Sequence, residues 1–143
     1  MAGIALNDAG LLREQCFIDG AWTGAGSIPV TDPASGATLA SVPDLGVMET
    51  RAAIAAAEAA LPAWRTRLAG ERSRILRRWY DLVMQHQDDL AMILTREQGK
   101  PLTEAKGEIA YAASFIEWFA EEAKRVYGET IPAHRTDSRI VVI

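Results

Sequence analysis

Residues 102–128 decide the fold: they run LTEAKGEIAYAASFIEWFAEEAKRVYG. Apolar side chains recur three or four positions apart along this stretch, which is the period of a helix that packs one face on a core. The apolar stripe comprises Leu102, Ala105, Ile109, Ala112, Ile116, Ala120, Ala123 and Tyr127. Gly128 is expected to follow the helix as its C′ cap, because glycine readily adopts the positive φ of that position.

The same helix carries a second line of residues on another side. This line comprises Gly107, Tyr111, Ser114, Phe115 and Trp118. A helix with aromatic residues outside its packing stripe must be covered twice or border a cavity. Nothing else in the chain is obviously available to cover this second side.

Two further helices are expected before this one. The nearer helix should stop at Gly99, with Pro101 just beyond, because glycine ends helices and proline cannot continue them. Its stripe comprises Ile75, Trp79, Leu82, Val83, Leu90, Ile93 and Leu94. The farther helix is alanine-rich, has Pro62 at or near its end, and carries Ile54, Leu61 and Trp64 at helical spacing. The pattern predicts three long helices over residues 47–128.

The residues before the helices are turn-rich and β-like. Asp19-Gly20 favours positive φ between apolar residues, which predicts a two-residue hairpin turn. Residues 28–32 and 38–42 have the composition of short strands, and a short leading helix is expected to close near residues 11–14. We therefore expect a small β-meander at about 16–43, and an α/β fold for the whole chain.

The last five residues, Arg139–Ile143, are one arginine followed by four apolar, β-branched residues, which predicts another strand. In the sequence, this strand is followed by no turn, no partner strand and no polar end. Natural sequences usually protect such an edge, because it invites aggregation. We therefore expect the chain to be cut in the middle of an element.

Composition narrows the class of protein. A net charge of −4 provides no general attraction to nucleic acid or to an anionic membrane. The opening residues show no basic segment followed by an apolar core, so we expect a cytoplasmic protein. A single cysteine excludes an internal disulfide and a zinc site of the CxxC kind. Six arginines lie close together but alternate with acids, which favours a solvated face: Arg65, Arg67, Arg72, Arg74, Arg77 and Arg78.

No residue that could carry chemistry has suitable neighbours in the sequence. Cys16 lies in a predicted strand without a nearby histidine, which favours an inert, partly buried thiol. His86 and His134 have no partner at metal-ligand spacing. The chain contains no GxGxxG, P-loop, HExxH or GxSxG motif. On the residues alone, this is a soluble α/β fragment without an active site.

Several uninterrupted strings resemble the opening of aldehyde dehydrogenases. They are Asp32-Pro-Ala-Ser-Gly36, Leu61-Pro-Ala-Trp64, His86-Gln-Asp-Asp-Leu90, Glu97-Gln-Gly-Lys-Pro101, Glu104-Ala-Lys-Gly-Glu108, residues 111–122 and Tyr127-Gly-Glu-Thr-Ile-Pro132. The last two strings are similar to the bacterial, NADP-dependent succinate-semialdehyde branch. The likeness runs in one register from about Leu11 to Ile143.

The resemblance implies a domain assignment. Residues 1–128 would be the N-terminal part of the cofactor-binding domain, and residues 129–143 would begin an arm that forms a homo-oligomer from near Ile131. The catalytic domain would be absent from this chain, and the remainder of the same subunit would be its first partner. The family's catalytic cysteine, general-base glutamate and nicotinamide-binding loops all lie further along, so no catalytic or cofactor-binding residue is carried over.

The resemblance also implies roles for four residues. Tyr111 and Phe115 would line the approach to a small aldehyde substrate, with interdomain packing as an equally weighted alternative. Glu97, together with backbone near Val30, would hold a structural monovalent cation. An alternative of at least equal weight is that Glu97 binds no cation and simply lies near a reversal of the chain.

For the full-length protein, the resemblance implies NADP- or NAD-dependent oxidation of succinate semialdehyde through a covalent cysteine intermediate. The isolated chain is expected to be inactive and to bind neither cofactor tightly. Two alternatives stay open. One is another semialdehyde or betaine-type dehydrogenase, and the other is a non-catalytic interaction module that docks through its terminal strand. The abrupt apolar end of that strand counts against the module.

Overall fold

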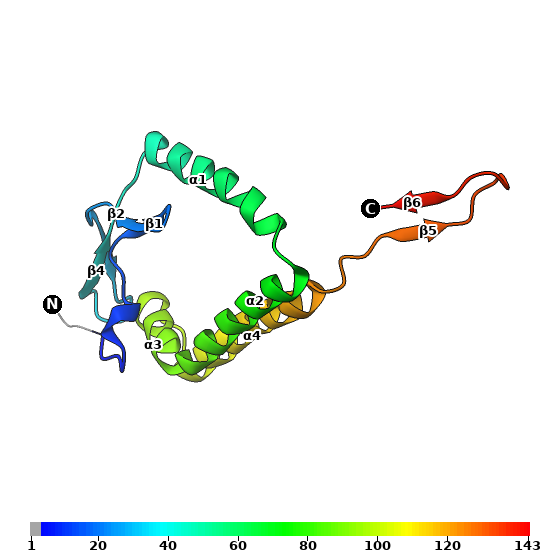
Figure 1. The fold of residues 1–143 in the computed structure, drawn as a ribbon. Coiled ribbons are helices and arrows are strands. Elements are labelled where there is room, and N and C mark those ends of the chain that lie inside the picture. The colour runs from blue at the N-terminus through cyan, green and yellow to red at the C-terminus, as the bar shows by residue number, and fades with distance from the viewer. Residues whose placement is uncertain (1–3) are drawn as a thin grey trace.

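The computed structural model describes residues 4–143. The opening residues, in which the sequence shows no targeting signal, therefore lie partly outside the described residues. Short hairpins come first, helices follow, and a last hairpin ends the chain (Figure 1). The elements are η1 (Ala9–Leu11), β1 (Cys16–Ile18), β2 (Ala21–Thr23), β3 (Ile28–Thr31), β4 (Thr38–Val42), α1 (Val47–Arg65), α2 (Ala69–Gln85), α3 (Gln87–Gln98), α4 (Leu102–Glu122), β5 (Glu129–Ile131) and β6 (Ile140–Val142).

The first four strands form two separate antiparallel hairpins rather than one meander. The β1–β2 turn is the predicted one, with φ of 50° at Asp19 and 78° at Gly20. β2 does not pair with β3. Gly24, with φ of 87°, turns the chain towards Pro43 instead, and a Cβ at Gly24 would lie only 2.8 Å from that ring. The leading helix is a single 3₁₀ turn that Asp8 caps by accepting a bond from Gly10 N.

Among residues 4–143, four α-helices take the place of the three expected. The second predicted helix is interrupted at His86, whose φ of −104° and ψ of 18° lie outside the helical range, and α3 begins at the next residue. The acids Asp88 and Asp89 then fall in the first turn of α3, where the partial positive charge of a helix start favours them. The apolar residues of the predicted helix keep their helical spacing on both sides of His86, so periodicity alone did not reveal the break there.

The last helix ends at Glu122, earlier than its apolar stripe suggested. Tyr127 therefore lies beyond the helix and is exposed. Gly128 is not a helix cap: its backbone lies against the Val142 carbonyl, where a side chain would have no room.

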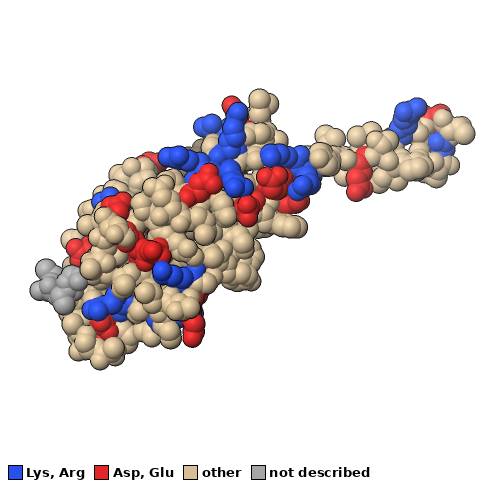
Figure 2. Space-filling view, turned by 90° about the horizontal axis from the view of Figure 1, so that it is seen from below, with Lys and Arg blue, Asp and Glu red and all other residues tan. Residues whose placement is uncertain are grey.

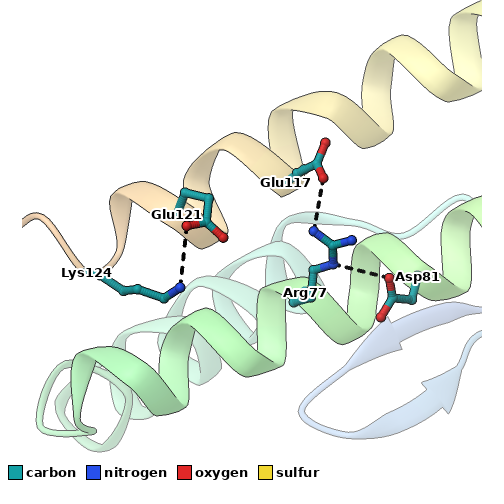
Figure 3. A network of polar contacts seen from close by, with 5 residues as sticks. All are labelled: Arg77, Asp81, Glu117, Glu121 and Lys124. Carbon is teal, nitrogen blue, oxygen red and sulfur yellow. Dashed lines mark hydrogen bonds and ion pairs between the residues drawn. The ribbon is translucent and has the colours of Figure 1, made fainter.

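The helical layer is held together by small side chains. α2 and α3 both pack on α4, and the fully buried residues at these contacts are alanines: Ala91, Ala105, Ala113 and Ala120. The sequence stripe placed Ala112 inwards, but Ala112 is exposed and its neighbour Ala113 is buried. On the rim, Arg77 of α2 bonds Glu117 of α4 at 3.0 Å and Asp81 at 3.3 Å (Figure 3).

Two elements stand away from this layer. α1 lies apart from α2–α4 across an open ring of ribbon, and none of its residues is buried (Figure 1). The β5–β6 hairpin projects from the end of α4. The terminal strand, expected without a partner, pairs antiparallel with β5 in the register Glu129↔Val142. Within residues 4–143, no helix is both long and apolar enough to cross a membrane.

Candidate functional site

The outer side of α4 carries an exposed aromatic face. Tyr111, Phe115 and Trp118 are 66%, 49% and 64% exposed, although the other side of the same helix is buried. The rings of Tyr111 and Phe115 meet edge to face, with centroids 5.0 Å apart and planes at 79°. Ser114 donates a 2.7 Å bond from Oγ to the Tyr111 carbonyl oxygen one turn back. The second line of residues was expected to be covered twice or to border a cavity, and in the described residues its aromatic rings are exposed.

A hollow of about 820 Å³ lies along this face towards the end of the helix. Its lining comprises Ser114, Phe115, Glu117, Trp118, Phe119, Glu121 and Arg125. Phe115 therefore lines the hollow. Tyr111 is not among the lining residues, but its ring packs against the ring of Phe115. Such a volume would suit a small organic ligand, but the hollow is a shallow surface until other residues cover it.

The charged groups that border the hollow are already paired. Glu117 accepts from Arg77 at 3.0 Å, and Glu121 accepts from Lys124 at 3.4 Å (Figure 3). Arg125 donates to Glu122 at 2.6 Å. These pairs neutralise the rim, so the hollow as described offers an apolar wall rather than reactive groups.

The C-terminal end of α3 lies against the β3–β4 turn. Arg96 Nη2 forms an ion pair with Asp32 Oδ2 at 2.9 Å. Gly99, with φ of 81°, reverses the chain so closely to Pro33 that a Cβ there would lie 2.9 Å from Pro33 Cγ. The predicted cation ligands belong to these two segments: Glu97 is exposed in the last turn of α3, and Val30 is half-buried in β3.

The strand next to Val30 is irregular. The β3–β4 register shifts between Val30 and Thr31, and such a bulge locally disrupts the ladder of backbone hydrogen bonds. Backbone carbonyls and one carboxylate are oxygen ligands of the kind that hard cations take. The structure places the end of α3 beside the β3–β4 turn, and the assignment of a cation to Glu97 and Val30 remains a prediction.

Two buried carboxylates were not singled out from the sequence. Asp32 is 7% exposed and Asp89 is 5% exposed. A bond from Ala34 N, helped by the Arg96 charge, holds the pKa of Asp32 below its ordinary value despite burial. Bonds from the Asn7 and Asp8 amides likewise lower the pKa of Asp89. Both side chains therefore stay ionised at neutral pH.

The sequence contained a local indication that Asp32 and Asp89 could accept hydrogen bonds from backbone amides. Asp32 opens a Pro- and Gly-containing turn, where aspartate commonly accepts bonds from amides two or three residues on. Asp89 belongs to an Asp-Asp pair, a composition typical of a first helical turn. The partners of Asp89 are more than 80 residues away in sequence, and no local signal indicated them.

The remaining polar candidates gain no partners that would support chemistry. Cys16 is half-buried in β1, His86 sits at the α2–α3 corner, and His134 is exposed. Among residues 4–143, no three His, Cys, Asp or Glu side chains cluster closely enough to hold a metal ion.

Two of the six clustered arginines, Arg72 and Arg77, form polar contacts within the molecule. Arg72 donates to the carbonyl oxygens of Arg65, the last residue of α1, and of Arg67 just beyond it. Arg77 bridges Asp81 and Glu117. On the face drawn in Figure 2, cationic and anionic side chains lie among each other instead of forming one large basic patch.

Comparison with known proteins identifies the family. Residues 22–143 match the aldehyde dehydrogenase family. The chain belongs to that family. Its hairpins and four helices match the N-terminal part of the aldehyde dehydrogenase fold.

Individual relatives narrow this further. The chain is 62% identical over 141 residues to the NADP⁺ succinate-semialdehyde dehydrogenase of Escherichia coli, covering 96% of this chain and 29% of that protein. It is 60% identical to a glutarate-semialdehyde dehydrogenase of Pseudomonas aeruginosa, again covering 29% of it. A crystal structure of an NADP-dependent enzyme from E. coli superposes with a TM-score of 0.93 at 61% identity, covering 96% of this chain and 29% of that one.

The chain therefore spans about 29% of the length of the relatives it matches. The aldehyde dehydrogenase resemblance inferred from the sequence strings is confirmed, and so is its placement near the succinate-semialdehyde branch.

Proposed function

We propose that these residues are the N-terminal part of an NADP- or NAD-dependent aldehyde dehydrogenase that oxidises a small semialdehyde with a carboxylate at its far end. The observation that carries the proposal is the identity of about 60% to both a succinate- and a glutarate-semialdehyde dehydrogenase. Succinate semialdehyde is the first candidate substrate. Glutarate semialdehyde is the second, because it differs only by one methylene and the two relatives are almost equally similar.

Within that enzyme, residues up to 128 would belong to the cofactor-binding domain and residues 129–143 would begin the oligomerisation arm. The hairpin supports the second assignment, because β5 and β6 project from the helices and are exposed along their length. An exposed strand edge is a ready template for pairing with another chain. The proposed assembly is a homo-oligomer joined through this arm. The proposed compartment is the cytoplasm.

The aromatic face of α4 would form one wall of the substrate approach. The edge-to-face pair of Tyr111 and Phe115 supports this role, because it fixes two rings outside the packed side of the helix. The remainder of the subunit would supply the opposite wall, the cofactor and the catalytic groups. Glu97 and backbone near Val30 would hold a monovalent cation behind this wall and stiffen the α3–α4 corner.

The chemistry would follow from groups outside these residues. In the complete enzyme, a cysteine from the remainder of the subunit would act as the nucleophile, and the nicotinamide cofactor, when bound there, would supply the hydride acceptor. The contribution of the described residues is to bind and orient the aldehyde chain and to exclude water. A carboxylate on the substrate would need a cation from the rest of the subunit, since Arg125 at the hollow is already paired with Glu122.

The test is a specificity profile of the full natural chain. Reduction of NADP⁺ and NAD⁺ would be followed with succinate semialdehyde, glutarate semialdehyde and butyraldehyde, an uncharged aldehyde of similar length. The proposal expects kcat/KM to favour the semialdehydes by on the order of 100-fold or more, because a site built for a polar group rejects an analogue that lacks it. Equal turnover of butyraldehyde would contradict it.

A pair of variants tests the wall. Tyr111→Ala and Phe115→Ala are expected to raise KM for the semialdehyde while changing Tm little. Tyr111→Phe keeps the ring and should preserve KM. A loss of Tm with unchanged KM in both alanine variants would instead assign the rings to interdomain packing.

A further inference from the structure

The segment before β1 is fastened to the start of α3 by one buried carboxylate. Asp89 accepts bonds from Asn7 N at 2.9 Å, Asn7 Nδ2 at 3.0 Å and Asp8 N at 2.8 Å. Three donors on a single side chain that is 5% exposed make a specific attachment rather than a passing surface contact. We call this attachment the Asp89 clasp.

A second attachment lies on the same face of α3. Arg96, seven residues after Asp89, pairs with Asp32 of the β3–β4 turn at 2.9 Å. Seven residues are close to two full turns of an α-helix, so the two side chains leave the helix in nearly the same direction. Gly99 adds a close backbone contact with Pro33 just beyond. We call the Arg96–Asp32 pair the Arg96 clasp.

A different side of α3 faces the other helices. Gln87 donates from Nε2 to the Lys106 carbonyl at 2.9 Å, and Lys106 pairs with Asp88 at 2.8 Å. Adjacent residues on a helix point about 100° apart, so Asp88 and Asp89 serve different neighbours. Asp88 ties α3 to α4, whereas Asp89 ties it to the N-terminal segment.

The attached segments are also tied to one another. Glu14 Oε1 accepts a 2.7 Å bond from Ser41 N, which joins the stretch after η1 to β4. Gln15 Nε2 donates to the Gly24 carbonyl at 3.4 Å, which joins it to the loop after β2. Residues 4–42 are thus cross-linked by polar contacts. The β3–β4 turn lies against the end of α3, whereas β1 contacts α1.

We propose that residues 4–42 form a lobe that opens from α3 as one unit, and that the Asp89 and Arg96 clasps hold it closed. Proteins open locally in contiguous cooperative units. Residues 4–42 are cross-linked to one another by polar contacts, so we expect them to open together. Opening breaks both clasps and leaves the alanine-packed layer of α2, α3 and α4 intact. The proposal is independent of the dehydrogenase activity, because it concerns how this lobe is attached.

Amide hydrogen exchange of the full natural chain, read by mass spectrometry, tests the proposal. In Asp89→Asn one acceptor oxygen becomes an amide that faces the donors of Asn7 and Asp8. The expected result is exchange about tenfold faster throughout residues 4–42, β3 and β4 included, with α2 and α4 unchanged. Arg96→Met, which breaks the other clasp, should accelerate the same set of amides.

Asp88→Asn is the matched control, because it breaks an exposed pair one residue away and should leave exchange in residues 4–42 unchanged. Asn7→Ala removes a single donor and serves as a milder variant if Asp89→Asn fails to fold. Acceleration confined to Asn7 and Asp8, with β3 and β4 still protected, would overturn the proposal, and so would acceleration spread equally over α2 and α4.

Discussion

Gly99 and Pro33 lie so close that no side chain fits between them: a Cβ on Gly99 would be 2.9 Å from Pro33 Cγ. This contact closes the corner at which α3 ends and the chain turns into α4. The same corner holds the Arg96–Asp32 pair and the exposed Glu97 carboxylate. The position of α4, and with it the aromatic face, depends on this corner.

Gly99→Ala is expected to destabilise the chain by about 1–3 kcal/mol, because alanine is strained at a φ of 81° and its Cβ meets Pro33. The free energy of unfolding in urea measures the effect. Gly107→Ala is the matched control. Gly107 lies inside α4 with open space around it, so the same substitution there should stabilise by about 0.5–1 kcal/mol. Changes of the same sign would contradict the assignment.

Ala113→Leu is expected to cost about 1–3 kcal/mol or more, since Ala113 is fully buried against the helical layer and a larger side chain overpacks it. Ala112→Leu, one residue earlier and exposed, should stay within about 0.5 kcal/mol. Urea unfolding of the 143-residue chain distinguishes the two. The reverse ranking would restore the helical stripe that the sequence suggested.

The stability of the chain should fall in acid. The pKa values of Asp32 and Asp89 are lowered on folding from 3.8, so each carboxylate contributes stability that is complete above the unfolded pKa. That contribution is lost as pH falls below 3.8 through the folded pKa, because protonation removes an acceptor from Ala34 or Asn7 and weakens the attraction to Arg96 or His86. Tm against pH checks this, and Asp89→Asn should flatten the acid limb. An unchanged acid limb in this variant would count against it.

Arg77→Met is expected to change stability by only about 0–1 kcal/mol, although Arg77 bridges two helices in Figure 3. The side chains of Arg77 and Glu117 are 49% and 42% exposed, so solvent screens their attraction. A double-mutant cycle with Glu117→Gln measures the coupling. A coupling well above 1 kcal/mol would mean that the bridge is an important α2–α4 contact.

Local features were predictable because their causes are local. Asp19-Gly20 forms its turn since both residues tolerate positive φ, and Gly99 ends a helix for the same reason. The separate aromatic side of α4 followed from helical periodicity, and the family followed from strings that resemble aldehyde dehydrogenases. The aldehyde dehydrogenase assignment therefore needed no coordinates.

By itself, the sequence determined the family, the mixed α/β class, the hairpin turns and the two-sided character of residues 102–122. The tertiary structure decided the corner at His86, the burial of Ala113 in place of Ala112, the pairing of β6 with β5 and the attachment of Asn7 and Asp8 to Asp89. The physical reason is the distance along the chain over which each effect acts. Positive φ and amphipathic period act within a few residues, whereas the partner of a strand edge or of a buried carboxylate is set by which distant segment folding brings beside it.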